Sequence, residues 1–296
     1  MSTGRHQFEG YLKGLFAVVV WGASFIATKI ALRYAPPMLI VWLRFGVGVG
    51  ILGLFVAVRR DFALVSRRDL AGYALLGFLG IAFHQWLQST GLLTAQATTT
   101  AWIVATTPIF IAILGRLFLQ EHLGWTKVGG IFLATLGVLI VVSRGDVASV
   151  VRWRFGTHGD FLILLSAVNW AVFSILSRRM LKGSSPTNMM LYVMGLGWLF
   201  VTVFLAGEYS AIPEVSFPRE GWIAVMFLGV FCSGFAYVFW YDALKALPAT
   251  RLGSLLYLEP LVAVAVAGVF LGEPVVPAVL AGGGLILFGV WLVNRG

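Results

Sequence analysis

Long apolar stretches separated by short polar breaks extend from one end of the chain to the other. A bilayer core about 30 Å thick is crossed by about 20 residues of helix. Ten stretches of roughly this length occur, centred near Val20, Gly48, Leu79, Thr107, Ala134, Val168, Leu199, Phe231, Leu261 and Leu285. Because a helix satisfies its own backbone polar groups inside lipid, the pattern predicts an all-α membrane protein with ten transmembrane helices.

The second half of the chain repeats the first. Pro108 and Glu121 recur as Pro260 and Glu273, 152 positions later. Further matches are Ala97-Thr98 with Ala249-Thr250 at the same offset, and Trp21 with Trp170, Lys29 with Arg178 and Pro37 with Pro186 at an offset of 149. Ten spans divide into five per copy, and an odd number makes the second copy enter the membrane from the opposite side. We therefore expect two inverted five-helix repeats around a central cavity, residues 1–145 and 159–296, with a linker at 146–158.

Composition and charge fit this interpretation. Hydrophobic residues make up 59% of the chain and charged residues only 11%. Of the 21 Lys and Arg residues, fourteen fall on the side of the N-terminus, five on the opposite side and two within spans. Positive loops stay in the cytoplasm, so both termini are expected there, in the inner membrane of a bacterium. The net charge of +9 then reflects topology and contact with anionic membrane lipids, and no nucleic-acid partner is expected.

The sequence offers little of the chemistry that enzymes use. The single cysteine, Cys232, lies in an apolar span, and the histidines other than His84 lie in loops or tails, so neither a metal site nor a cofactor is expected. The motifs of zinc proteases, serine hydrolases and phosphate-binding loops do not occur in the sequence. The chain is therefore predicted not to be an enzyme, with a channel or a membrane-embedded transferase as the less favoured alternative.

Polar side chains inside the spans are the first candidates for function, because hydrocarbon cannot satisfy them. They are Lys29, Arg44, His84, Gln85, Gln88, Asn169, Asp242 and Glu259. Lys29 and Arg44 are placed near outer ends of spans, where they could serve coupling or gating, or extend to the membrane surface instead. Asp242 is expected to form a cap or a surface ion pair beside Lys245.

The third span has a polar stripe. His84 and Gln88 are four residues apart and share a helical face, with Gln85 one step round. Such a stripe faces the interior of a bundle, because lipid offers no hydrogen bonds. We expect these three residues and Asn169 to bind substrate, with ordinary interhelical hydrogen bonds as the alternative.

Aromatic residues recur at helical spacing in several spans. Those considered for substrate binding are Trp102, Trp170, Tyr237, Trp240, Tyr241 and Tyr257. Stacking and cation–π contacts with a flat ring or an organic cation are worth about 0.5–2 kcal/mol each. The alternative is that these rings pack helices together or form belts at the membrane interface.

Two prolines lie at equivalent positions in the fourth and ninth spans. Pro108 and Pro260 are expected to bend their helices and to expose a carbonyl to the transport path, so both are candidates for gating. Glu259 precedes Pro260 and could bind a proton in exchange for substrate, or pair with a basic group. Glu121 and Glu273 are expected to interact with the N-termini of the helices that follow them, the fifth and tenth spans.

Glycines cluster near the start of the fifth and tenth spans, Gly129 and Gly130 in one, and Gly282, Gly283 and Gly284 in the other. Small residues allow helices to approach closely, within one chain or between two chains. A monomer and a homodimer therefore both remain open.

The sequence resembles the EamA-like branch of the drug/metabolite transporter superfamily. The resemblance is based on Trp21-Gly22 with Ser24, Phe25 and Lys29, on Pro37, Arg44-Phe45, Pro108, Glu121 and Gly130, and on Pro260, Glu273 and Gly282 in the second copy. It implies ten helices in two inverted repeats, a central cavity and export of small metabolites or drugs. The aromatic interior is similar to exporters of aromatic amino acids of the YddG type. The second copy departs from the first at Val193, which occupies the register of Arg44.

We therefore expect a secondary transporter that exports small metabolites by alternating access, most plausibly amino acids including aromatic ones. The alternative within the same superfamily is a cationic drug/proton antiporter, for which Glu259 is the acid required.

Overall fold

The computed structural model of the chain describes residues 2–119, 124–152, 156–180, 185–207, 216–247 and 249–295. These residues form helices joined by short loops, and ten of the helical segments are long and apolar enough to cross a membrane. Each predicted centre lies inside one of them. The prediction of an all-α protein with ten transmembrane helices is confirmed.

The helices of the first half are α1 (Ser2–Ala31), α2 (Pro37–Val58), α3 (Arg67–Gly77), η1 (Phe78–Phe83), α4 (His84–Gly91), α5 (Ala97–Val104), α6 (Thr107–Leu119) and α7 (Trp125–Ser143). Those of the remainder are α8 (Val147–Val151), α9 (His158–Met180), α10 (Pro186–Gly207), α11 (Arg219–Met226), η3 (Phe227–Phe235), α12 (Ala236–Ala246), α13 (Ala249–Leu255), η4 (Leu256–Leu258), α14 (Glu259–Phe270) and α15 (Pro277–Arg295). Helices α3, η1 and α4 together form the third span, and α11, η3 and α12 form the eighth.

Irregular helix segments recur at the offsets of the sequence repeat. The π-helices η1 and η3 begin at Phe78 and Phe227, 149 residues apart, and interrupt equivalent spans. Helices α5 and α13 begin at Ala97 and Ala249, 152 residues apart, and each ends a few residues before a proline. Segments of π-helix are often found at functional sites. The duplication is thus visible in local backbone geometry as well as in residue identity.

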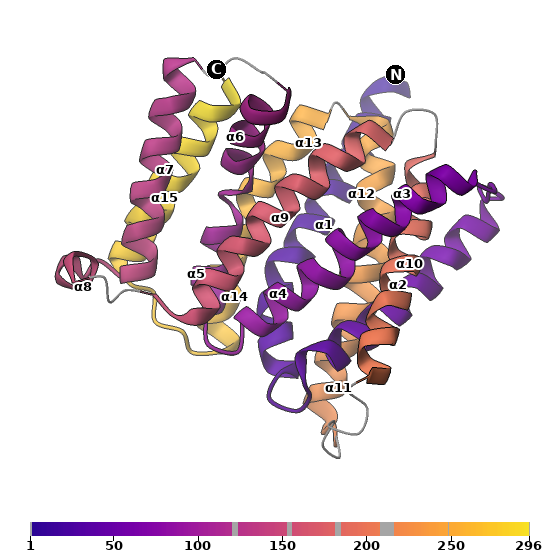
Figure 1. Cartoon of the computed structure of the whole chain (residues 1–296), viewed down its shortest axis with the longest axis horizontal. Helices are drawn as coiled ribbons and strands as arrows, with labels where there is room; N and C mark the ends of the chain where they lie inside the picture. Colours follow the sequence, from indigo (N-terminus) through magenta and orange to yellow (C-terminus); the bar gives the residue numbers. More distant parts are fainter. Residues whose placement is uncertain are drawn as a thin grey trace.

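The two halves pack against one another in a pattern that is unchanged when they are exchanged. Helix α1 packs on α12 and α14, and its counterpart α9 packs on α4 and α6. The second span α2 contacts its own counterpart α10, and α7 lies along its counterpart α15 (Figure 1). This reciprocal packing is what a pseudo-two-fold relation between the halves requires.

Both chain ends lie at the same end of the bundle, at the top of Figure 1. We call this end the terminal face. The opposite end contains the connections at residues 32–36, 92–96 and 271–276, and we call it the Lys29 face. The sequence predicts that the terminal face is cytoplasmic.

Glycines hold α7 and α15 together. An added Cβ at Gly137 would lie 2.5 Å from the carbonyl oxygen of Gly282, and one at Gly289 would lie 2.5 Å from that of Gly130. The backbones are therefore too close to admit side chains at these positions. Of the clustered glycines in the sequence, Gly130 and Gly282 lie in this close contact within one chain, whereas an added Cβ at Gly129 or Gly284 would meet nothing within 4 Å.

Candidate functional site

Arg44 is buried in the interior of the bundle. It lies on α2, its residue is 6% exposed, and the Cζ atom lies 5.1 Å from the centre of the Phe45 ring. Its Nε donates to Ser233 Oγ on η3 at 3.0 Å, and its Nη1 donates to Gln85 Oε1 on α4 at 3.3 Å. The expectation that Arg44 lies near a span end and could extend to the membrane surface is wrong, because helices α2, α4 and η3 enclose it.

A second polar side chain, His84, lies beside this arginine. Its ring stands 4.7 Å from the ring of Trp170, which stacks on Phe173 at 4.7 Å. The Nδ1 atom of His84 is buried and has no hydrogen-bond partner within the described part of the chain. A bound polar group or water is therefore needed to satisfy it.

The remaining members of the polar set divide between two roles. Asn169 donates from Nδ2 to the carbonyl of Leu79 at 2.8 Å, a contact inside the π-helix η1, where the backbone pattern is irregular. Gln88 is half-buried one turn beyond His84, toward the Lys29 face. Thus Gln85 contacts the arginine and His84 lies within its electrostatic range, whereas Asn169 binds a carbonyl of the irregular helix η1.

Aromatic side chains of the eighth span gather around Trp21 of α1. The ring of Trp21 lies 5.5 Å from that of Tyr237 and 5.2 Å from that of Trp240. Tyr237 lies within electrostatic range of both Arg44 and Glu259, and Tyr241 lies next to Tyr237 on the same helix face. The structure thus brings together the arginine, the predicted acid and the predicted aromatic face of this span.

Trp102 and Tyr257 lie apart from this group. Trp102 is fully buried, and its ring occupies the space beside Gly283 of α15. The Tyr257 hydroxyl accepts a hydrogen bond from Asn294 at the end of α15. Both rings therefore pack the fourth and ninth spans on the tenth span.

Each predicted proline bend coincides with a change from one helical segment to the next. Helix α5 ends at Val104 and α6 begins at Thr107, so Pro108 lies in the first turn of a new helix, as Pro260 does in α14. Proline is well suited to this position, because the first turn does not use its missing N–H. Thr107 Oγ1 donates to the Val104 carbonyl at 2.7 Å, which satisfies one acceptor freed by the break. Both prolines lie within single helical spans, Ala97–Phe118 and Arg251–Phe270, and exposure of a carbonyl to the transport path stays a prediction.

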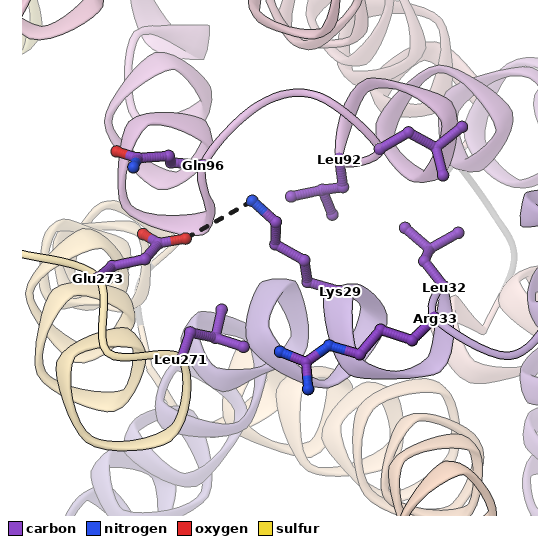
Figure 2. A pocket seen from close by; sticks show the side chains of 8 residues that line it. Lys29, Leu32, Arg33, Leu92, Gln96, Leu271 and Glu273 are labelled. Atoms are coloured by element: carbon purple, nitrogen blue, oxygen red, sulfur yellow. Dashed lines mark ion pairs between the residues drawn. The ribbon is translucent and has the colours of Figure 1, made fainter.

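A pocket of about 310 Å³ opens at the Lys29 face (Figure 2). It is lined by Lys29, Leu32, Arg33, Leu92, Leu93, Gln96, Leu271 and Glu273. Figure 2 shows the Lys29 side chain pointing toward Glu273, and Nζ lies 3.7 Å from Oε1. The same Nζ donates to the carbonyl of Ala95 at 2.5 Å. Lys29 thus ties the end of α1 to the start of the fourth span and to the segment after α14.

Glu273 caps a different helix from the one expected. Its carboxylate accepts hydrogen bonds from Ala97 N at 2.9 Å, Thr98 N at 3.1 Å and Thr98 Oγ1 at 2.8 Å. The capped helix is α5, whereas the tenth span begins only at Pro277. The expectation of a contact with the tenth span is wrong, and Glu121 lies outside the described residues. The sequence did not predict this contact. The only sign of it is that both repeats have an Ala-Thr pair and a glutamate at equivalent positions.

Ion pairs connect three spans at the terminal face. Asp242 accepts from Arg59 at 2.7 and 3.0 Å and from Lys13 at 2.9 Å. The bond to Asp242 raises the pKa of the Arg59 guanidinium above its ordinary value. The surface ion pair predicted for Asp242 is confirmed, but Lys245 pairs with Asp61 instead, at 3.9 Å.

Within the described residues no group of three His, Cys, Asp or Glu side chains could hold a metal ion. The buried group offers hydrogen bonds, aromatic faces and one permanent positive charge. These are the means of binding a small polar molecule reversibly.

Ten membrane-spanning helices in two interlocking halves, with charged and polar side chains buried where the halves meet, define a multi-pass membrane transporter. The chain belongs to the EamA-like transporter family, whose sequence profile matches residues 8–143 and 157–295. Family membership thus agrees with the fold and with the buried polar group.

Individual relatives align over nearly the whole chain. An uncharacterized transporter of Archaeoglobus fulgidus is 27% identical over 278 residues, 94% of this chain and 96% of the relative. A probable terminal-alkyne amino-acid exporter of Streptantibioticus cattleyicolor is 28% identical over 288 residues, 95% of this chain and 92% of the relative. A solved crystal structure at 21% identity has a TM-score of 0.68 and covers 96% of this chain and 98% of its own, a likeness of fold alone.

Proposed function

We propose that this protein is a secondary transporter that exports small amphipathic metabolites, chiefly amino acids including aromatic ones. The observation that carries the proposal is the group formed between the two halves by the buried Arg44 and His84 and the half-buried Trp170 and Tyr237. The group combines a guanidinium and an imidazole with two aromatic rings. An amphipathic zwitterion with a flat side chain matches both kinds of partner.

Alternating access is supported by the reciprocal packing of the halves. The first span, α1, packs on the eighth and ninth spans. Its counterpart, the sixth span α9, packs on the third and fourth spans. An exchange of the two arrangements converts a site open to one side into a site open to the other, as in other transporters built from repeats. The pocket at the Lys29 face and the ion pairs at the terminal face mark the two ends of such a path.

Export, rather than uptake, follows from family resemblance, and the Lys29 face is taken as external from the charge distribution of the loops. The relative from Streptantibioticus cattleyicolor, a probable amino-acid exporter, supports the substrate class. Membrane lipids surround the protein in either oligomeric state, monomer or homodimer.

A cationic drug/proton antiporter is the second candidate, and Glu259 is the observation that favours it. This acid begins α14 and has no cationic partner within 4 Å in the described part of the chain. The equivalent position in the first half is Thr107, so the acid is not a repeat feature. A carboxylate in this place could balance an organic cation or bind a proton.

Transport by purified protein in liposomes tests both candidates. The panel comprises labelled aromatic and aliphatic amino acids, nucleobases and a quaternary ammonium ion, each with and without an imposed pH gradient. Saturable transport of aromatic amino acids is expected. Transport of the quaternary cation alone would replace this proposal with drug efflux, and no transport of any panel member would contradict both.

The variant Glu259→Gln separates the two candidates further. The exporter hypothesis expects amino-acid transport to persist at a reduced rate, whereas drug efflux requires that cation transport is abolished. The matched control is Glu220→Gln, which removes a carboxylate from an exposed position at the start of α11. Unchanged transport of both substrate classes in Glu259→Gln would remove Glu259 from the mechanism.

A further inference from the structure

Arg44 differs from the other cations that connect spans. Lys13 and Arg59 are paired with Asp242, and Lys29 is paired with Glu273. Arg44 is more deeply buried than any of them, yet it has no carboxylate within 4 Å in the described part of the chain. A guanidinium keeps its proton inside a protein, so a full positive charge remains in the bundle without a counter-ion.

The hydrogen bonds of Arg44 are also incomplete. A guanidinium has five N–H donors, and only Nε and Nη1 have partners among the described residues, the neutral groups of Ser233 and Gln85. Burying a charge without a compensating partner destabilises a fold. A residue retained in this state needs a reason beyond the stability of the fold, and an anionic ligand supplies one.

The position of Arg44 points to the same conclusion. Ser233 occupies the register of His84, 149 residues later, so Arg44 lies between equivalent points of the third and eighth spans. It therefore lies where the halves meet, close to the axis that relates them. Substrate sites in repeat-built transporters lie at this interface.

We propose that Arg44 binds the carboxylate of the transported substrate. The planar guanidinium presents its free donors as a fork, which matches two carboxylate oxygens. Trp170 and Tyr237 then contact the apolar part of the substrate. Glu259, which lies within electrostatic range of Tyr237, can receive the ammonium group of the substrate. This assignment rests on the proposed function and narrows it to substrates that have a carboxylate.

The site is asymmetric, because the position equivalent to Arg44 in the second half is not an arginine. Val193 occupies the register of Arg44 in the other half and is fully buried. The interface therefore holds one anchor for an anion, and not two. A molecule with one carboxylate at one end is bound in a single orientation, whereas a dicarboxylate finds no equivalent partner.

The test compares amino acids with their carboxamides, in which a neutral amide replaces the carboxylate that Arg44 would bind. Wild-type protein in liposomes is expected to prefer phenylalanine over phenylalaninamide by about 10- to 100-fold in kcat/KM, the range of a charge-assisted hydrogen bond. Arg44→Gln is expected to reduce this ratio to near one. Arg44→Lys, which keeps a charge but not the fork, is expected to give an intermediate ratio.

Arg68→Gln is the matched control. It removes the same charge from an exposed position on α3 and is expected to leave the ratio unchanged. Because the readout is a ratio of two substrates, differences in expression or reconstitution cancel.

The outcomes separate the two proposals. If wild-type protein transports neither compound nor any other amino acid, the proposed function fails. If it transports phenylalanine and the carboxamide equally well, or if the ratio survives in Arg44→Gln, the function stands and Arg44 is only a structural link between spans. Should Arg44→Gln fail to fold, the wild-type ratio and Arg44→Lys decide: a ratio near one in the wild type, or an unchanged ratio in Arg44→Lys, overturns the assignment.

Discussion

Replacing Glu273 by glutamine is expected to loosen the N-terminus of α5. The carboxylate accepts from Ala97 N, Thr98 N and Thr98 Oγ1 at 2.8–3.1 Å, and it lies 3.7 Å from Lys29 Nζ. Loss of a helix cap costs about 0.5–2 kcal/mol. Loss of a negative charge at a helix N-terminus costs about 0.3–1 kcal/mol, and up to about 2 kcal/mol where it is partly buried. Glutamine keeps one acceptor oxygen, so we expect a net cost of about 1–2 kcal/mol.

Hydrogen–deuterium exchange measures this cost locally. Opening of the first turn of α5 becomes about 5–30 times more frequent for a loss of 1–2 kcal/mol, so the amides of Ala97 and Thr98 should exchange faster by that factor. The control is Asp146→Asn, which changes the cap of α8, where Asp146 accepts from Ser149 N at 3.1 Å. It should leave the exchange of α5 unaltered.

Lys29→Met provides a second comparison. Lys29 is the more exposed partner, with 26% of its side chain accessible against 8% for Glu273, and the pair is long at 3.7 Å. Ion pairs of this kind contribute about 0.2–1 kcal/mol, and Lys29→Met also removes the bond to the Ala95 carbonyl beside α5. Faster exchange in Lys29→Met therefore measures both contacts together. Unchanged exchange in a folded Glu273→Gln protein would show that the cap does not hold this helix.

Two further predictions concern stability. Gly137→Ala should destabilise the protein by about 1–3 kcal/mol in detergent unfolding, because its Cβ would lie 2.5 Å from a backbone oxygen, whereas Gly284→Ala meets nothing within 4 Å and should be neutral. Equal effects of the two substitutions would contradict the close packing of α7 and α15. Asp242→Asn leaves Arg59 and Lys13 without their carboxylate, and should cost less than about 1 kcal/mol and make stability less sensitive to salt. If the stability of Asp242→Asn depends on salt as strongly as that of the wild type, the ion pairs of Asp242 are not the source of the salt dependence.

The ten spans could be predicted because hydrophobic length is a local property of the sequence. The irregular segments η1 and η3, like α5 and α13, begin at positions that the sequence repeat relates, although the sequence did not predict that these segments are irregular. Their π-helical form could not be predicted, because spacing along the sequence does not show contacts between spans, such as that of the Asn169 side chain with the Leu79 carbonyl.

The site was predicted less completely, because sequence spacing orders side chains along one helix but not across several. His84 and Gln85 were correctly placed together, and their neighbour Trp170 lies 86 positions from His84. Trp102 has the same chemistry as Trp170 yet packs on the tenth span. Glu273 was assigned to the next helix in the chain, although its contacts lie 175 and 176 positions away.

The differences between the repeats indicate what the repeats are for. Positions that shape the backbone, such as Pro108 and Pro260, are equal in the two halves, so each half can adopt the geometry of the other. Positions near the axis are unequal: Arg44 has Val193 as its counterpart, and Glu259 has Thr107. A substrate with unlike ends requires unlike partners, and a symmetric site would bind it equally well in two opposed orientations. We therefore expect exchange of the backbone arrangement to open the path to either side, while the unequal residues near the axis fix how the substrate is bound.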